Sequence, residues 1–183
     1  MISKFSFFLK IAIYLPISMV LIGCSSTLET ATKIGQIISD PSTPVGPIED
    51  RPSTMTLTLL TDNNVNPNDD GEPSPLELQV IYLSEDSKLL ASYYEQFEGD
   101  SLKDILGKNY ISHQDYAVQP DQYKVISDIT LDKDTRYLGV IAYYSDPEKA
   151  QWRKVIPIKG KGYHYNILVY LKKWTFDIKE YKE

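Results

Sequence analysis

Apolar and polar residues alternate along most of the chain beyond residue 54. Met55, Leu57 and Leu59 are separated by threonines, and similar alternations recur in later segments separated by turn-forming residues. Successive side chains of a strand point to opposite faces, so each segment predicts a strand with one buried face. Short strands at this spacing predict a mainly β fold, an antiparallel β-sandwich. The alternating segments are 55–59, 76–82, 123–131, 152–158, 163–171 and 174–178.

Two of the predicted strands have more specific patterns. Residues 135–145 are apolar on both faces and predict a central strand, in which Gly139 permits close packing or a bulge. In segment 123–131 the sandwich requires one apolar face. We assign to that face Tyr123, Val125, Ile129 and Leu131.

A helical insertion interrupts the strand pattern. Apolar residues recur at helical spacing between Leu89 and Phe97 and predict an amphipathic helix. A second, shorter helix is expected at 101–106, where Ser101 and Asp104 resemble a capping box and the following glycine suits the helix end. We expect this small insertion to cover one side or end of the sandwich.

The N-terminus has the features of an export signal. Residues 1–23 contain Lys4 and Lys10, no acidic residue, and an apolar run at 11–22 that is too short for an ordinary membrane span. The sequence LIGC then ends at Cys24, the only cysteine, and resembles a bacterial lipobox. This resemblance implies that Cys24 carries a covalent lipid, and it leaves no cysteine for a disulfide.

The remaining chain divides into a tether and a domain. Residues 24–53 include the turn-rich sequence PSTPVGP and predict a lipidated N-terminus followed by a flexible tether. Residues 54–183 are long enough for one domain, which we expect in the periplasm. The formal charge of -6 becomes more negative when the two signal-peptide lysines are removed, and this excludes ordinary nucleic-acid binding.

The sequence contains little that points to catalysis. His113 and Asp115 fall on one strand face, but two ligands are too few for a typical zinc site, and His164 reads as a partly exposed strand residue. We find no nucleophile, phosphate-binding or dinucleotide motif and predict that the chain is not an enzyme and needs no cofactor. The 14 tyrosines leave one alternative, a lipoprotein that binds a small molecule or glycan through a tyrosine-rich sheet.

The loop sequence NPNDDGEPSPLE, which begins at Asn66, has two interpretations. Asn66, Asn68, Asp70, Gly71 and Glu77 match the spacing of an EF-hand calcium loop. However, three prolines stiffen the segment, and strands flank it where an EF-hand has helices. We therefore predict no metal and interpret the segment as a rigid loop presented to another protein.

Taken in order, these features resemble the TssJ family, the outer-membrane lipoproteins of the type VI secretion system. The similarity covers the lipobox, the tether, the loop ending in GEPSP, the strand LELQVIYL, the helix and the strand YLGVIAYY followed by Trp152 and Arg153. It implies a transthyretin-like sandwich, a lipid on Cys24, a place on the periplasmic face of the outer membrane, and binding to the periplasmic C-terminal domain of TssM. The partner contacts it implies are Asn66, Asn68, Asp69, Asp70, Gly71 and Glu72.

Overall fold

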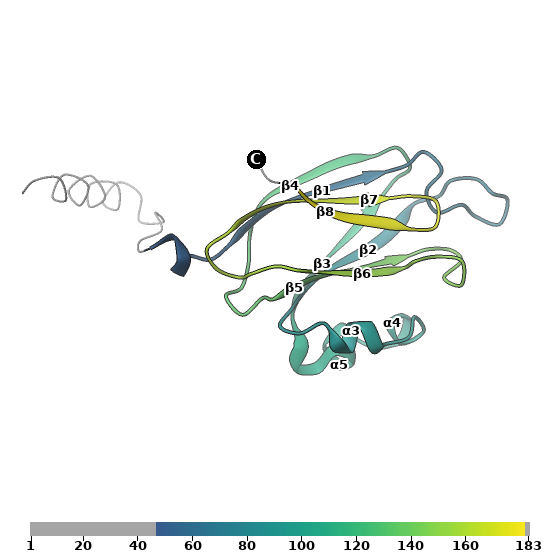
Figure 1. Ribbon diagram of the computed structural model, residues 1–183. Coiled ribbons are helices and arrows are strands. Elements are labelled where there is room, and N and C mark those ends of the chain that lie inside the picture. The colour runs from purple at the N-terminus through teal and green to yellow at the C-terminus, as the bar shows by residue number, and fades with distance from the viewer. Residues whose placement is uncertain (1–46, 182–183) are drawn as a thin grey trace, which may run out of the picture. The chain divides into compact units, whose positions relative to one another are not determined.

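The computed structural model describes residues 47–181, and they form two four-stranded sheets packed face to face (Figure 1). The strand orders are β4-β1-β7-β8 and β3-β2-β5-β6. Every neighbouring pair is antiparallel except β1 and β7, which run parallel. The first sheet contains β1 (Thr54–Thr61), β4 (Tyr123–Thr130), β7 (His164–Leu171) and β8 (Phe176–Tyr181). The second contains β2 (Leu76–Leu83), β3 (Tyr110–Val118), β5 (Tyr137–Tyr143) and β6 (Arg153–Pro157).

The predicted alternation builds the core between the sheets. Met55, Leu57 and Leu59 of β1 are fully buried there, and β7 buries every second residue from Tyr165 to Leu171. The central position of β5 is also confirmed, since all five of its interior residues are buried. The mainly β sandwich with a small helical insertion is therefore the observed fold.

The prediction of a single apolar face for 123–131 is wrong because β4 contains a bulge. Two steps along β1, from Met55 to Leu57, oppose three steps along β4, from Ile129 to Ile126. Asp128 adopts φ 60° within this bulge, and an extra residue of this kind shifts the side-chain alternation by one. As a result Ile129 points into the core, whereas Tyr123 and Val125 are 68% and 45% exposed.

The helical insertion covers the outer face of the second sheet (Figure 1). It contains α3 (Ser87–Ala91), α4 (Gln96–Gly99) and α5 (Leu102–Leu106), and the short helix η2 (Gly107–Asn109) follows. The layer buries Leu89, Phe97 and Leu106 against Ile81 and Leu83 of β2. This second core explains why β2, unlike β1, is buried on both faces near its end.

The predicted helix from Leu89 to Phe97 is instead two short helices, α3 and α4. The Arg153 guanidinium donates to the backbone oxygens of Leu89, at 2.9 Å, and of Ser92. The Ser92 backbone is extended, and the Tyr93 N–H, which would continue the helix by bonding Leu89 O, bonds Gln96 Oε1 at 2.8 Å instead. The Ser101 cap of α5 is confirmed, since its hydroxyl accepts from the backbone N–H of Asp104 at 3.2 Å.

Gly139 permits the close packing of the helical layer. A Cβ atom at this position would lie 2.6 Å from Leu89 Cδ2, so only a glycine lets α3 approach β5 this closely.

Salt bridges join the two sheets along the edge formed by β6 and β8. Asp177 of β8 accepts from Lys154 at 3.0 Å and from Lys172 at 2.7 Å.

The residues that precede β1 pack against one end of the sandwich. The short helix η1 (Ile48–Asp50) precedes β1, and Ser53 is buried, donating its backbone N–H to Gly160 at 2.8 Å. The last residues of the predicted tether, 47–53, therefore contact the domain that we predicted to begin at residue 54. The division of the chain into 1–23, 24–53 and 54–183 otherwise stays a prediction, and Cys24 lies outside the described residues. Within 47–181, no helix is both long and apolar enough to span a membrane.

Candidate functional site

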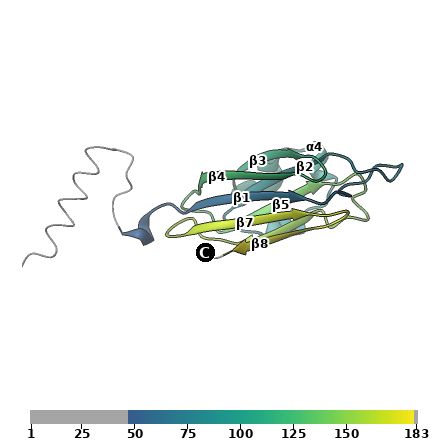
Figure 2. The ribbon, with the colours of Figure 1, turned by 90° about the horizontal axis from the view of Figure 1, so that it is seen from above.

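Four connections gather at the end of the sandwich opposite η1, and we call this the loop end. They are residues 62–75, 119–122, 144–152 and 172–175. The segment between β1 and β2, residues 62–75, projects farthest from the sheets in both views (Figures 1 and 2). It includes the sequence that we predicted to contact a partner.

The tip of this loop is held by the side chain of Asn68. Its Oδ1 atom accepts from the backbone N–H groups of Asp70, at 3.1 Å, and Glu72, at 2.9 Å. Gly71 completes the turn with φ 81°, a conformation that residues with a Cβ atom rarely adopt. A backbone bridge between Pro67 and Pro73 closes the turn at its base. The exposed carboxylates at the tip are those of Asp69, Asp70 and Glu72.

Asn66 does not belong to this exposed surface, in contrast to our prediction. It is 5% exposed, and its φ of 47° is a left-handed value that asparagine tolerates. Its Nδ2 donates to Pro75 O at 2.7 Å and to Ser74 Oγ at 3.0 Å, while its Oδ1 accepts from the Ser145 N–H at 2.7 Å. Asn66 therefore positions the loop and is too buried to contact a partner directly.

The base of the loop is tied to the neighbouring loop, residues 144–152. The Ser145 hydroxyl donates to Pro67 O at 2.7 Å, in addition to its backbone bond with Asn66. The buried Tyr144 hydroxyl donates to Thr175 O at 2.7 Å, which connects the same loop to the turn between β7 and β8. Burial raises the pKa of Tyr144, so its hydroxyl keeps its proton and acts as a donor here. These contacts present the acidic tip on a braced base.

A groove of about 420 Å³ lies between the two loops. Its charged side chains include an ion pair, in which Lys149 Nζ lies 2.5 Å from Asp146 Oδ2. The hydrogen bond to Lys149 lowers the pKa of Asp146, although both groups are exposed to solvent. We define this groove by its lining residues, which are Pro67, Asn68, Asp69, Ser145, Asp146, Pro147, Glu148, Lys149 and Trp174.

Our sequence reasoning missed the second wall of the groove. The sequence SDPEK, which begins at Ser145, lies among the turn-forming residues between two predicted strands, and Trp174 begins the last alternating segment. No local pattern relates Asn66 to Ser145, because their hydrogen bond joins residues 79 positions apart. The fold brings them together by placing the end of β5 beside the start of β2.

The observed geometry argues against the calcium interpretation of the loop. The side-chain oxygens of Asn66 and Asn68 would be the first two ligands, but both accept hydrogen bonds from backbone N–H groups. Among residues 47–181, no cluster of three or more acidic, histidine or cysteine side chains is arranged to hold a metal ion. The residues present therefore do not fit an EF-hand site.

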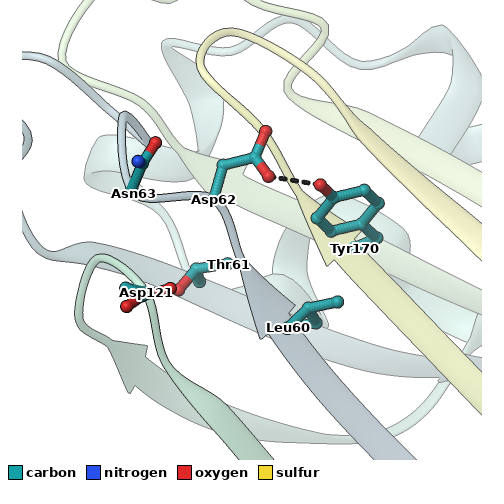
Figure 3. Close-up of a pocket in the computed structure, with 6 residues that line it drawn as sticks. All are labelled: Leu60, Thr61, Asp62, Asn63, Asp121 and Tyr170. Atoms are coloured by element: carbon teal, nitrogen blue, oxygen red, sulfur yellow. Dashed lines mark hydrogen bonds between the residues drawn. The ribbon is translucent and has the colours of Figure 1, made fainter.

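A second hollow opens at the loop end on the outer face of the first sheet (Figure 3). In it the Tyr170 hydroxyl donates to the Asp62 carboxylate, and this bond raises the pKa of Tyr170. Leu60, Thr61 and Asp121 line the hollow from β1 and from the turn after β3. The Asp62–Tyr170 bond fixes the start of the projecting loop to β7.

The polar residues considered for catalysis lie on the strands. His113 and Asp115 do share a strand face, with Nε2 3.5 Å from Oδ2, and His113 Nδ1 shares a 2.7 Å hydrogen bond with the Tyr110 hydroxyl. His164 bonds Thr54 at 2.7 Å. The large exposed tyrosines belong to different parts of the described chain and do not form one stacking surface. They are Tyr93, Tyr123, Tyr163 and Tyr181.

Comparison with known proteins identifies relatives of this fold. The crystal structure of the type VI lipoprotein TssJ1 from Pseudomonas aeruginosa is 26% identical, with a TM-score of 0.67 over 72% of this chain and 98% of that chain. Lip of Serratia marcescens, a membrane-bound component of the type VI secretion system, is 20% identical, with a TM-score of 0.59 over 72% and 98%. A chain in a structure of the TssM C-terminal domain from EAEC is 20% identical, with a TM-score of 0.56 over 69% and 100%.

The family comparison covers most of the described domain. The model for the type VI secretion lipoproteins, described as VasD, EvfM and TssJ, matches residues 53–174. The comparison with curated proteins returns no match. The family match includes the projecting loop, the groove and seven complete strands. The chain therefore belongs to the TssJ family of type VI secretion lipoproteins.

Proposed function

We propose that this chain is lipidated at Cys24, anchored in the outer membrane, and binds the periplasmic C-terminal domain of TssM through the tip at 68–72. The observation that carries the partner contact is the tip itself. Asp69, Asp70 and Glu72 project from a turn whose backbone is fixed by Asn68 and whose base is fixed by Asn66. A loop already ordered before binding loses less conformational entropy when the complex forms.

The position of the tip also supports this role. β1 begins after η1 and ends at the projecting loop, so η1 and the tip lie at opposite ends of the sandwich (Figure 1). A lipid on Cys24 would hold the first end near the membrane and leave the tip directed at the partner. Two or more acyl chains on one cysteine give a stable membrane anchor.

Titration calorimetry tests the contact. Residues 25–183, which lack the lipidated cysteine, are titrated with the TssM domain of the same organism. Changing Asp69→Asn, Asp70→Asn and Glu72→Gln together should weaken binding at least about tenfold, because three charges at one contact are removed. The matched control neutralises three exposed acids at the other end of the domain, at Glu49, Glu85 and Asp134.

Two results would contradict the proposal. If the folded, unaltered chain does not bind the TssM domain, the partner is wrong. If the control variant loses as much affinity as the tip variant, the attraction comes from net charge and the contact is not at the tip.

The anchor is tested separately in cells. Cys24→Ser should remove palmitate labelling, release the protein from the outer-membrane fraction and abolish secretion by the system, while the purified domain keeps its affinity for TssM. Normal secretion with an unlabelled, soluble protein would refute the anchoring role.

A further inference from the structure

The groove beside the tip already contains a cation from its own chain. The Lys149 ammonium lies 2.5 Å from the Asp146 carboxylate and 6.0 Å from the centre of the Trp174 ring. An ammonium near a carboxylate and an indole gains both ion-pair and cation–π attraction. The groove is therefore chemically suited to a positively charged side chain.

Lys149 holds this position only loosely. Its side chain is 69% exposed, and its ion pair joins residues three apart on a surface turn. An exposed pair of this kind contributes little stability, so the lysine can leave the groove at low cost. Trp174, by contrast, is held in place. Its backbone oxygen accepts from the Gln151 N–H at 2.8 Å, and the centre of its ring lies 6.3 Å from that of Tyr144.

The remaining charges of the groove are negative. Asp69, Asp146 and Glu148 line it together with Lys149, so a partner would meet an excess of carboxylates around an indole. Asp69 comes from the tip and the other two acids from the neighbouring loop. A basic side chain on the partner could thus bridge both loops, whereas an acidic side chain would be repelled.

We propose that the groove is a second part of the TssM contact and receives one lysine or arginine side chain of that domain, which displaces Lys149. The incoming cation stacks on the Trp174 indole and pairs with Asp146. This assignment rests on the proposed function, because it names the partner's chemistry at the same loop end. It assigns Lys149 the role of an internal competitor and not of a partner contact.

Three single substitutions distinguish these roles in the titration with the TssM domain. Trp174→Leu removes the indole but keeps an apolar side chain, and it should weaken binding about tenfold. Asp146→Asn should weaken it several-fold, because the carboxylate charge is lost. Lys149→Gln removes the competitor and should strengthen binding several-fold. Weaker binding by Lys149→Gln would mean that the lysine contacts the partner, and this would overturn the proposal.

Fluorine NMR shows whether the groove is occupied, and it does so independently of affinity. The chain contains only two tryptophans, so labelling it with 5-fluorotryptophan gives two resonances while the unlabelled TssM domain is silent. Trp152, which packs against Tyr94 and Phe97 of the helical insertion, serves as the internal reference. Trp152→Phe assigns the signals. Addition of the TssM domain should shift the Trp174 resonance and leave that of Trp152 unchanged.

The outcomes separate this inference from the proposed function. Binding that the tip substitutions weaken, but that Trp174→Leu and Asp146→Asn leave unchanged, would retain the partner and overturn the groove assignment. An unshifted Trp174 resonance in the saturated complex would have the same meaning. Absence of binding by the unaltered, folded chain would overturn both.

Discussion

Substitution of the buried Asn66 should destabilise the projecting loop without changing its exposed side chains. Asn66→Ala removes three side-chain hydrogen bonds, those with Pro75 O, Ser74 Oγ and the Ser145 N–H. It also places alanine at a φ of 47°, a left-handed value that is unfavourable for a side chain unable to bond its own backbone.

The expected loss of stability follows from the groups left without partners. Pro75 O and the Ser145 N–H lose their partner, and each of these partly buried hydrogen bonds contributes about 1 kcal/mol. The left-handed backbone adds about 1 kcal/mol for alanine. The free energy of unfolding should therefore fall by about 3 kcal/mol for Asn66→Ala and by about 2 kcal/mol for Asn66→Gly, which tolerates the backbone angle.

Urea unfolding of residues 25–183, followed by tryptophan fluorescence, measures these differences. Asp69→Ala is the matched control on the same loop, because its side chain is exposed and its loss should change stability by less than about 0.5 kcal/mol. Equal stability of the Asn66→Ala and Asp69→Ala variants would refute the reasoning. An alanine variant no less stable than the glycine variant would refute the backbone contribution alone.

Three further substitutions test other parts of the structure. Gly139→Ala should destabilise the domain by about 1–3 kcal/mol in urea unfolding, because its Cβ would lie 2.6 Å from Leu89 Cδ2. Arg153→Lys should raise amide hydrogen exchange in the helical insertion more than in the sheets, because one ammonium cannot reproduce the paired guanidinium bonds. Asp177 has its pKa lowered to about 2 by hydrogen bonds to two lysines, so its stabilisation is complete above pH 3.8 and is lost as the pH falls toward 2. Asp177→Asn should remove that part of the acid unfolding curve, which solvent screening limits to about 1 kcal/mol.

Strand positions were predictable where side chains alternate regularly, and wrong where the backbone breaks the alternation. β1 and β7 followed the period of two along their whole lengths. In β4 the bulge at Asp128 reverses the facing of Tyr123 and Val125, and a single sequence gives no clear signal for a left-handed aspartate. The helical spacing from Leu89 to Phe97 was correct for the burial of those two residues, but Leu90 and Tyr93, which fall on the same predicted face, are 48% and 74% exposed because the helix breaks between α3 and α4.

The candidate site was predictable in position and only partly in detail. The density of asparagine, aspartate, glycine and proline marked residues 66–77 as an exposed, stiff connection. Composition cannot distinguish an asparagine that braces a loop from one that faces a partner. That distinction depends on which loops are neighbours, and Asn66 becomes a buried residue only because Ser145 and Pro75 surround it.

The pairing of β1 bears on how the domain would transmit force between the proposed lipid anchor and TssM. A pull between the N-terminal attachment and the tip acts on the two ends of β1, which joins them directly. β1 pairs along its length with β7 on one side and with β4 on the other. Because interstrand hydrogen bonds run across the strands, a force along β1 loads many of them together in shear and does not open them one at a time. Within the described domain, residues 47–53 and the tip are thus connected through one of the most fully paired strands of the fold, a route that would suit the proposed attachment to a membrane at one end and to TssM at the other.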